Sequence, residues 1–301
     1  MNHLSMSAHA GTKTFVAQLP TIDTNTFTIQ LLTDGDESEV LDFLAERPTH
    51  TVMLAGFIRD NGLESPLNRG SFYAWRSGSG TLEGVALVGE ITTFEARTDA
   101  ALAAFARCAR EAPKVSVIIG EQEKVQKFWG YFAGDDQPPP IFCSELFFEL
   151  RVAAAPGDSL PQLRTATSDD LDLVLAVHAE MAYEESGINP LEVDPEGFRR
   201  RCARRIEQGR VWVWIENQRL IFKADIISET LDVCYLEGIY VNHEERGKGH
   251  GFRCISQIGK TLLSRTKSVC LLVNEENLQA QRLYRKANFQ LRGHYDTIFL
   301  P

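Results

Sequence analysis

The sequence predicts two tandem copies of one α/β (α+β) fold, and three observations support this prediction. The chain has 301 residues, whereas single domains typically span about 50 to 200 residues. Hydrophobic periodicity and turn signals give the same order of helices and strands twice, although the residues themselves hardly repeat. A stretch rich in Ala, Pro and Gly, residues 153–161, has the composition of a linker between the two copies.

The first copy is expected over residues 27–152. Residues 1–26 carry Ser, Thr, Asn and His without sustained periodicity, so they are expected to form a disordered or extended segment. The elements expected after this segment, in chain order, are helices over 39–47 and 52–60, strands over 71–75, 82–89 and 91–96, a helix over 99–112, a strand over 115–119, a helix over 122–132 and a strand over 141–150.

The second copy, residues 162–301, repeats this order. A short strand is expected over 163–166, followed by helices over 169–185 and 195–208 and by strands over 211–215, 220–228 and 233–242. After these come a glycine-rich loop, a helix with Ile255, Ile258 and Leu262 on its apolar face, a strand over 268–274, and a helix that Asn277 can cap.

The glycine-rich loop has the composition of an anion-binding site. Its sequence is Arg246-Gly247-Lys248-Gly249-His250-Gly251. Glycine at alternate positions lets the backbone take φ > 0, so that successive N–H groups can point into one concavity. The loop also precedes a helix, where unpaired N–H groups and the helix dipole favour negative charge. Together with the basic side chains, this pattern predicts a site for a phosphorylated ligand.

Two other phosphate-binding motifs are excluded by their spacing. A dinucleotide fingerprint reads G-x-G-x-x-G, and here the third glycine comes too early. The triplet Gly259-Lys260-Thr261 is typical of a P-loop, but the first glycine of that motif would fall at position 254, which is Cys.

The remaining pattern, R-x-x-G-x-G between a strand and a helix, resembles the GNAT superfamily of acyl-CoA-dependent N-acyltransferases, in which this loop cradles the coenzyme A pyrophosphate. The resemblance continues in N-x-x-N-x-x-A-x-x-L-Y-x-K-x-x-F, which runs from Asn274 to Phe289 and is similar to the family's second coenzyme A motif. Asn288 stands where the family usually has Gly. Asn is the next-best residue at a left-handed helix C-cap, so the motif tolerates this departure.

The resemblance implies both a fold and a cofactor site. Each copy would be a mixed, mainly antiparallel, twisted sheet flanked by helices, and acetyl-CoA would be the co-substrate, without a metal. Backbone amides in the strand before the loop would hold the pantetheine arm and polarise the thioester carbonyl. The implied cofactor-binding residues are Ile239, Tyr240, Val241, Arg246, Gly247, Lys248, Gly249, His250, Gly251, Asn274, Asn277, Ala280 and Tyr284.

The first copy is expected to lack this site. In place of the loop it has residues 94–99, Phe-Glu-Ala-Arg-Thr-Asp, with acids and no glycine. Such a segment offers a pyrophosphate neither a backbone concavity nor net positive charge. Trp129 stands roughly where the second copy has Tyr284, which removes the hydroxyl as well. The pattern resembles the divergent N-terminal domain that is fused to GNAT domains in some bacterial proteins.

Acyl transfer from a thioester to an amine needs a base. The amine has a pKa of about 10, so a carboxylate or a water chain must remove its proton. Glu237 is the first candidate, because it lies on the strand that in GNAT proteins runs beside the cofactor, where the family often uses a Glu. Two alternatives remain open. Glu237 could pair with a cation on an adjacent strand, or the base could come from the acids Glu180, Glu184 and Glu185, which would otherwise be a solvated helix face.

Tyr284 is the predicted acid. It lies within the helix face formed by Ala280, Leu283 and Ala287, and its hydroxyl would protonate the departing thiolate. The alternative is a tyrosine that only packs.

Composition limits the partners. A formal net charge of −10 argues against general nucleic-acid binding and favours neutral or cationic substrates. No apolar run approaches the roughly 18 residues of a membrane helix, the N-terminus lacks a secretory h-region, and six scattered cysteines show no disulfide framework or metal-ligand spacing. A cytoplasmic protein without a membrane partner is therefore expected.

One segment is locally basic, and its arginines could face an anionic partner or the cofactor's nucleotide end, or form a solvated face paired with acids. These residues are Arg199, Arg200, Arg201, Arg204 and Arg205.

The sequence thus predicts an N-acetyltransferase that moves acetyl from acetyl-CoA to a primary amine of a small molecule or peptide, by direct attack in a ternary complex. The alternative is a protein that senses acyl-CoA through the same loop without turnover. Tandem GNAT folds also occur among transferases that use aminoacyl-tRNA, but an intact pyrophosphate loop is not expected in those.

Overall fold

A computed structural model describes residues 28–134, 137–154 and 160–300. The chain divides into two compact units. The C-terminal unit comprises Phe147–Arg292, and the N-terminal unit comprises the described residues up to Leu146 together with those from Gly293 onward. The predicted N-terminal segment and residues 155–159 of the predicted linker lie outside the described residues. Within the described residues, no helix has both the length and the apolarity needed to span a membrane.

The N-terminal unit follows the predicted element order. Its elements are β1 (Thr28–Leu31), α1 (Glu37–Ala45), α2 (Val52–Asn61), β2 (Gly70–Arg76), β3 (Leu82–Gly89), β4 (Ile91–Ala96), α3 (Asp99–Glu111), β5 (Val117–Glu121), α4 (Gln122–Ala133) and β6 (Ile141–Leu150). The strand order in this unit is β1-β2-β3-β4-β5-β12-β6. The pairs β1–β2, β2–β3, β3–β4 and β5–β12 are antiparallel, whereas β4 and β5 are parallel.

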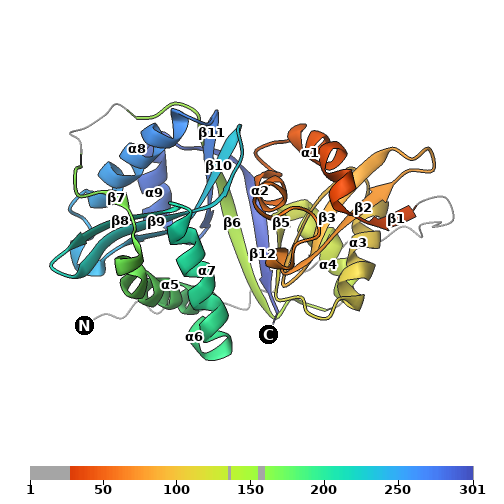
Figure 1. The fold of residues 1–301 in the computed structure, drawn as a ribbon, viewed down its shortest axis with the longest axis horizontal. Coiled ribbons are helices and arrows are strands. Elements are labelled where there is room, and N and C mark those ends of the chain that lie inside the picture. Colours follow the sequence, from red (N-terminus) through yellow and green to blue (C-terminus); the bar gives the residue numbers. More distant parts are fainter. Residues whose placement is uncertain (1–27, 135–136, 155–159, 301) are drawn as a thin grey trace. The chain divides into compact units, whose positions relative to one another are not determined.

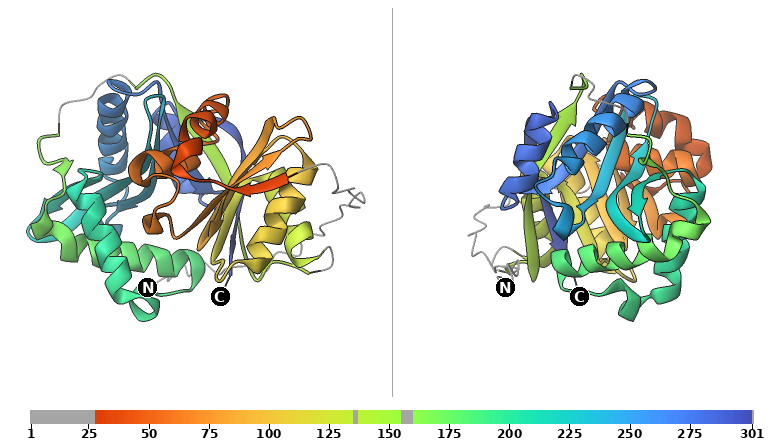
Figure 2. Two further views of the ribbon diagram at one scale, coloured as in Figure 1. Left: turned by 45° about the vertical axis from the view of Figure 1, so that its right-hand side comes forward. Right: turned by 90° about the vertical axis from the view of Figure 1, so that its left-hand side faces the viewer.

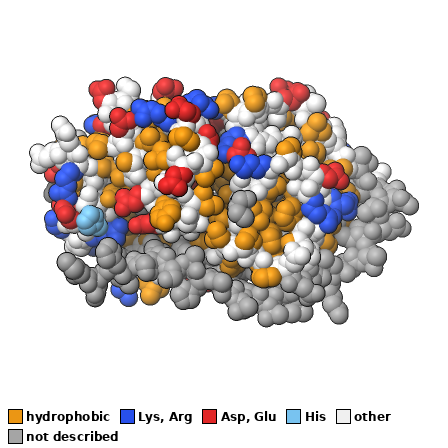
Figure 3. Space-filling view, turned by 90° about the horizontal axis from the view of Figure 1, so that it is seen from below, with side chains coloured by type: hydrophobic (Ala, Val, Ile, Leu, Met, Phe, Trp, Pro, Cys, Tyr) orange, Lys and Arg blue, Asp and Glu red, His pale blue; other side chains and the backbone are white. Residues whose placement is uncertain are grey.

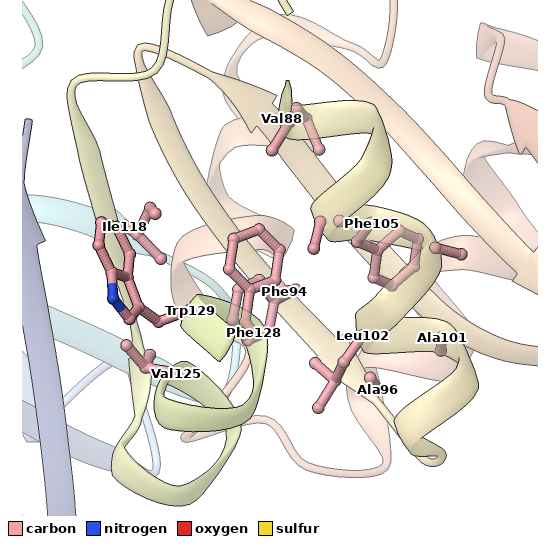
Figure 4. Close-up of a cluster of buried hydrophobic side chains, with 14 of the residues drawn as sticks. Val88, Phe94, Ala96, Ala101, Leu102, Phe105, Ile118, Val125, Phe128 and Trp129 are labelled. Carbon is pink, nitrogen blue, oxygen red and sulfur yellow. The ribbon is translucent and has the colours of Figure 1, made fainter. Parts of the chain in front are cut away.

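Side-chain alternation along β2 and β3 builds a core on each face of this sheet. Phe72 and Val85 join one cluster with residues of α1 and α2. Trp75 and Ala86, which point to the opposite face, join a second cluster with α3 and α4. Successive strand residues point to opposite faces, so one sheet can bury both helix pairs. Figure 4 shows part of the second cluster, including the rings of Phe94, Phe105, Phe128 and Trp129.

The C-terminal unit repeats this architecture. Its elements are β7 (Arg164–Thr165), α5 (Leu171–Ser186), α6 (Pro190–Val193), α7 (Pro195–Glu207), β8 (Val211–Glu216), β9 (Arg219–Glu229), β10 (Val233–Val241), α8 (His250–Leu263), β11 (Ser268–Asn274) and α9 (Leu278–Lys286). The strand order is β6-β11-β10-β9-β8-β7. Strands β10 and β11 are parallel, whereas the pairs β7–β8, β8–β9 and β9–β10 are antiparallel. Helices α5 and α7 cover one face, and α8 and α9 cover the other (Figures 1 and 2). The predicted mixed, mainly antiparallel sheet with flanking helices is confirmed.

Two strands are divided between the units. Strand β6 gives residues 147–150 to the C-terminal unit, and β12 (Gln290–Phe299) gives residues 293–299 to the N-terminal unit. There β12 pairs with β5, from Tyr295↔Glu121 to Phe299↔Val117. The last residues of the chain therefore complete the sheet of the first copy.

Among the α-helices and β-strands of the described residues, three have no counterpart in the prediction: β1, the single-turn helix α6, and β12. The sequence of β12 does not show the alternation of apolar and polar residues that indicates a strand, because polar residues occupy buried positions in it. Asp296 is fully buried, and its carboxylate accepts hydrogen bonds from Gln122, Gln126 and Ser144. From the sequence alone, an aspartate is expected at the surface, and only these hydrogen bonds make its burial possible.

Candidate active site

A β-bulge in β10 lies inside the sheet of the C-terminal unit. Glu237 pairs with Asp225 of β9, yet the next paired residue of β10 is Tyr240, opposite Lys223. Over this stretch β10 therefore has one residue more than β9, and Gly238 takes a φ of +58° there. Such a bulge disrupts the hydrogen-bond ladder locally and redirects the neighbouring side chains.

Strands β10 and β11 stop pairing where the bulge begins. Their parallel register ends at Leu236↔Leu271, although β10 continues to Val241 and β11 to Asn274. Beyond that point, Tyr240 and Val241 keep their pairing with β9. The edge of residues 239–241 that turns away from β9 is thus not paired with β11, as a backbone site for an extended arm requires.

The glycine-rich loop runs into the N-terminus of α8, as predicted. Gly247 and Gly249 have φ values of +80° and +83°, and a Cβ built on either would meet no described atom within 4 Å. Gly249 is the N-cap of α8 and supplies no side-chain cap to its first turn. The first N–H groups of the helix therefore remain available to an anion. Gly251 serves packing instead, because a Cβ there would lie 3.1 Å from Cγ2 of Val241.

The charged side chains of the loop form only weak contacts with the rest of the protein. Lys248 Nζ lies 2.8 Å from Oε2 of Glu245, and Arg246 Nε donates a hydrogen bond of 3.1 Å to the carbonyl of Val241. Exposed ion pairs of this kind contribute little to stability, because water and salt screen the attraction between the charges. A bound pyrophosphate could therefore compete with Glu245 for Lys248.

The second predicted motif forms the N-terminus and C-terminus of α9. Asn277 caps the helix, since its Oδ1 accepts from the Ala280 amide at 3.0 Å. Asn274 Oδ1 accepts from the Glu276 amide at 2.8 Å. Asn288 follows the helix with a φ of +72°. Its predicted left-handed C-cap conformation is confirmed.

Tyr284 lies on the buried face of α9. The residue is 5% exposed, and its ring contacts those of Phe148 and Phe289, with centroids 6.2 and 5.8 Å away. Burial raises the pKa of its hydroxyl. That hydroxyl has no hydrogen-bond partner among the described residues.

Glu237 precedes the bulge and stays reachable by solvent. The Tyr235 hydroxyl donates a hydrogen bond of 2.9 Å to its Oε1. The surrounding protein nevertheless displaces enough water to raise the pKa of the carboxyl, and the Tyr235 hydrogen bond opposes this. Within the described residues Glu237 forms no ion pair, because Lys223 on the adjacent strand pairs with Asp225 instead.

Glu185, at the end of α5, is electrostatically coupled to Glu237. Desolvation, and then repulsion by the Glu237 carboxylate, raises the pKa of Glu185 to about 7. The negative charge of one carboxylate disfavours the ionisation of the other. Desolvation is the largest cause that raises the pKa of the Tyr240 hydroxyl, and Glu180 and Glu184, the other two acids predicted as possible bases, are close enough to raise it further. The acidic end of α5 therefore faces β10.

The basic segment of α7 is largely neutralised by acids. Arg199 pairs with Asp172 at 2.7 Å, Arg201 with Asp194 at 2.9 Å, and Arg205 with the buried Asp225 at 3.1 Å. Of the two alternatives for this arginine segment, these contacts favour a helix face that is paired with acids. On the face that Figure 3 draws, Lys and Arg side chains lie among Asp and Glu side chains.

The sequence prediction missed a buried polar network beneath the bulge, formed by Lys223, Asp225, Arg205 and His178. One signal for it was present. Lys223 and Asp225 alternate within the otherwise apolar strand sequence Leu-Ile-Phe-Lys-Ala-Asp-Ile, residues 220–226.

The corresponding region of the N-terminal unit is closed. Beyond its last pairing with β5, at Thr92↔Ile118, β4 carries Phe94, whose ring stacks on Phe128 with centroids 4.6 Å apart. The side chain of Thr98 caps the next helix at the Ala101 amide. Its first turn also contains the Asp99 carboxylate. Aromatic rings, a cap and an acid thus occupy the places that the C-terminal unit leaves open.

We therefore expect a single acetyl-CoA site per chain. Calorimetric titration of the full chain with acetyl-CoA should give a stoichiometry near one. A stoichiometry near two, or a co-crystal with cofactor at the first turn of α3, would contradict this asymmetry.

Among the described residues, no cluster of three or more His, Cys, Asp or Glu side chains could hold a metal ion. All six cysteines lie in the helices and strands predicted for them and are free thiols.

Residues 223–298 match a family model described as "FR47-like protein". Among solved structures, a GNAT-family acetyltransferase from Colwellia psychrerythraea is 12% identical, with coverage of 90% of this chain and 98% of that one and a TM-score of 0.55. A GCN5-related N-acetyltransferase from Sphaerobacter thermophilus is 13% identical, with coverage of 91% and 95% and a TM-score of 0.57. A tandem GNAT protein from the clavulanic acid biosynthesis pathway is 14% identical, with coverage of 91% and 98% and a TM-score of 0.55.

No curated protein matches the sequence. At these identities the solved structures show the fold alone. The chain has the fold of tandem GNAT proteins, which confirms the fold that the sequence resemblance implied.

Proposed function

We propose that this chain, a tandem GNAT fold with an FR47-like segment over residues 223–298, is an N-acetyltransferase that transfers acetyl from acetyl-CoA to a primary amine of a small molecule or peptide. The observation that carries the proposal is the combination, within one unit, of an uncapped helix N-terminus after a glycine loop, an unpaired strand edge and a coupled pair of carboxylates.

The residues present fit coenzyme A. The pyrophosphate would bind the loop over 246–251, where Gly247 and Gly249 leave the space of a side chain empty. The pantetheine arm would pair with backbone groups of residues 239–241, beyond the last residue pair of β10 and β11. Asn274, Asn277 and Ala280 would border the site from the start of α9.

Glu237 and Glu185 would prepare the amine. An ammonium ion has no lone pair, so it must lose a proton before it attacks. The coupled carboxylates can attract a cationic acceptor and take that proton, which ends on one of the two carboxyl groups. The nitrogen then forms a bond to the thioester carbon while the carbon–sulfur bond breaks, and it loses its second proton, which replaces the proton that Tyr284 gives to the leaving thiolate. Backbone N–H groups of residues 239–241 would stabilise the negative charge that develops on the carbonyl oxygen.

Tyr284 would give its hydroxyl proton to the leaving thiolate. Its raised pKa keeps the hydroxyl protonated before the thiolate forms, and the tyrosinate left by the transfer would regain a proton from the attacking nitrogen.

Replacing Tyr284 with Phe separates an acid from a packing residue. The ring and its contacts with Phe148 and Phe289 remain, but the acidic proton is lost. We expect the turnover number to fall by about tenfold or more, with unchanged folding and acetyl-CoA affinity. A matched control is Tyr183→Phe, at an exposed tyrosine of α5. A Tyr284→Phe enzyme that turns over at the parent rate would leave Tyr284 as a packing residue.

A screen of primary amines with acetyl-CoA, followed by the release of free thiol, tests the proposed function. We expect release that depends on the amine and is fastest for cationic acceptors, because carboxylates line the acceptor side of β10. The second candidate, a sensor, is favoured if acetyl-CoA binds tightly but no amine accelerates thiol release.

A further inference from the structure

The bulge of β10 rests on a buried cation. Lys223, on β9, has an exposed fraction of 0%, and Asp225, two residues further, has 1%. Lys223 Nζ donates to Oδ2 of Asp225 at 2.8 Å and to the carbonyl of Gly238 at 3.2 Å. The second bond joins the ammonium directly to the bulged peptide.

Two helices complete the surroundings of this pair. Arg205 of α7 donates to Oδ2 of Asp225 at 3.1 Å, and Nδ1 of His178 on α5 lies 3.8 Å from the same oxygen. Burial, with Lys223 as the next cause, lowers the pKa of His178 to about 3, so its imidazole is neutral. Burial acts to raise the pKa of Asp225, but Lys223 and Arg205 outweigh it and the pKa is lowered. The network therefore holds one carboxylate and two cations.

The shape of the bulge matches the position of the ammonium. Gly238 has a φ of +58°, and a Cβ added to it would lie 2.8 Å from Lys223 Nζ and 3.2 Å from Asp225 Oδ2. The ammonium thus occupies the space that a side chain at position 238 would need. Glu237 directly precedes this peptide, and residues 239–241 directly follow it.

A contribution to the stability of the fold does not explain well why Lys223 and Asp225 are buried as an ion pair. Replacing a buried ion pair by apolar residues of similar volume is often neutral or stabilising, because desolvation offsets the attraction between the charges. A buried cation aimed at one carbonyl does, however, fix the orientation of that peptide, and a charged donor forms a stronger hydrogen bond than a neutral one.

We propose that Lys223 is a positioning residue for acyl transfer. Its ammonium, neutralised by Asp225, holds the Gly238 carbonyl and thereby orients the Glu237 carboxyl on one side and the amides of residues 239–241 on the other. This inference rests on the proposed function for its effect on turnover, but not for its effect on the bulge.

The test is Lys223→Met in the full chain. Methionine keeps most of the length of the side chain, and Asp225 and Arg205 remain as a balanced pair, so we expect a melting temperature within a few degrees of the parent. Turnover with acetyl-CoA and the best amine of the screen should fall by about tenfold to a hundredfold, since displaced reacting groups lose rate steeply. Amide hydrogen exchange in residues 239–241 should become at least about tenfold faster. Lys260→Met, at an exposed position of α8, is the matched control and should change neither quantity.

A second variant covers the case in which Lys223→Met does not fold. Gly238→Ala keeps every charge but pushes a methyl group against Lys223 Nζ, so it should lower turnover and speed the same exchange. Parent rates of both turnover and exchange in Lys223→Met, or in Gly238→Ala if only that variant folds, would overturn the proposal. If the parent chain transfers acetyl to no amine, the proposed function fails, while the exchange comparison still decides whether Lys223 holds the bulge.

Discussion

Replacing Gly249 with Asp is expected to abolish the binding of acetyl-CoA. Gly249 is the N-cap of α8, has a φ of +83° and has open space where a side chain would begin. Aspartate would fill this space, cap the free N–H groups of the first turn with its own carboxylate, and place a negative charge at the pyrophosphate. Losing two or more charge-assisted hydrogen bonds should weaken binding by about a hundredfold or more.

Calorimetric titration of both proteins with acetyl-CoA measures this effect. Gly209→Asp is a matched control, because Gly209 also has a positive φ, +68°, and open space at its Cβ position. That control carries the same backbone strain and the same added charge in the same unit, but away from the loop. If Gly249→Asp binds acetyl-CoA within a few-fold of the parent, the loop is only a turn and does not hold a pyrophosphate.

The second large effect is expected for Glu237→Gln. The amide keeps the size of the side chain and can still accept the hydrogen bond from Tyr235, but it cannot take a proton from an ammonium ion. The turnover number should therefore fall by a factor of roughly 10² to 10⁴. The affinity for acetyl-CoA should hardly change, because the pyrophosphate loop is untouched. Glu229→Gln, at an acid of β9 that pairs with Arg265, is the control.

The dependence of turnover on pH should change in the same variant. In the parent, desolvation and then the Glu237 carboxylate raise the pKa of Glu185 to about 7, so kcat/KM should rise as the pH passes through this value and the Glu185 carboxyl loses its proton. Removing the charge of Glu237 removes part of the repulsion, so the pKa of Glu185 falls and the remaining activity should reach its plateau at a lower pH. Unchanged turnover across this range would move the base to Glu180, Glu184, Glu185 or water.

Local chain chemistry made the loop and its helices predictable. The glycines, the apolar spacing of α8 and the caps at Asn277 and Asn288 each act within a few residues, and the structure places them as the sequence predicted. The likeness of the two copies was predictable for a related reason. Each element carries its own periodicity, even though the sequences of the two copies differ.

The missed features depend on contacts distant in sequence. Strand β12 carries a buried aspartate whose partners lie about 150 to 174 residues earlier, so its pattern does not indicate a strand. The bulge arises from the register between β9 and β10, which no local signal fixes. Lys223 looks like an exposed residue of an amphipathic strand until the carbonyl of Gly238 and the carboxylate of Asp225 are seen beside it.

The central claim is that the C-terminal unit transfers acetyl to an amine, and product detection tests it most directly. The full chain is incubated with acetyl-CoA labelled in its acetyl group and with the best amine of the screen. The mass of the amine product is then measured by mass spectrometry. We predict a labelled acetamide that accumulates in step with free coenzyme A in the parent chain, at a rate strongly reduced in Glu237→Gln and absent in Gly249→Asp. Tight acetyl-CoA binding without labelled amide, or equal amide formation by the parent and Gly249→Asp, would contradict the claim.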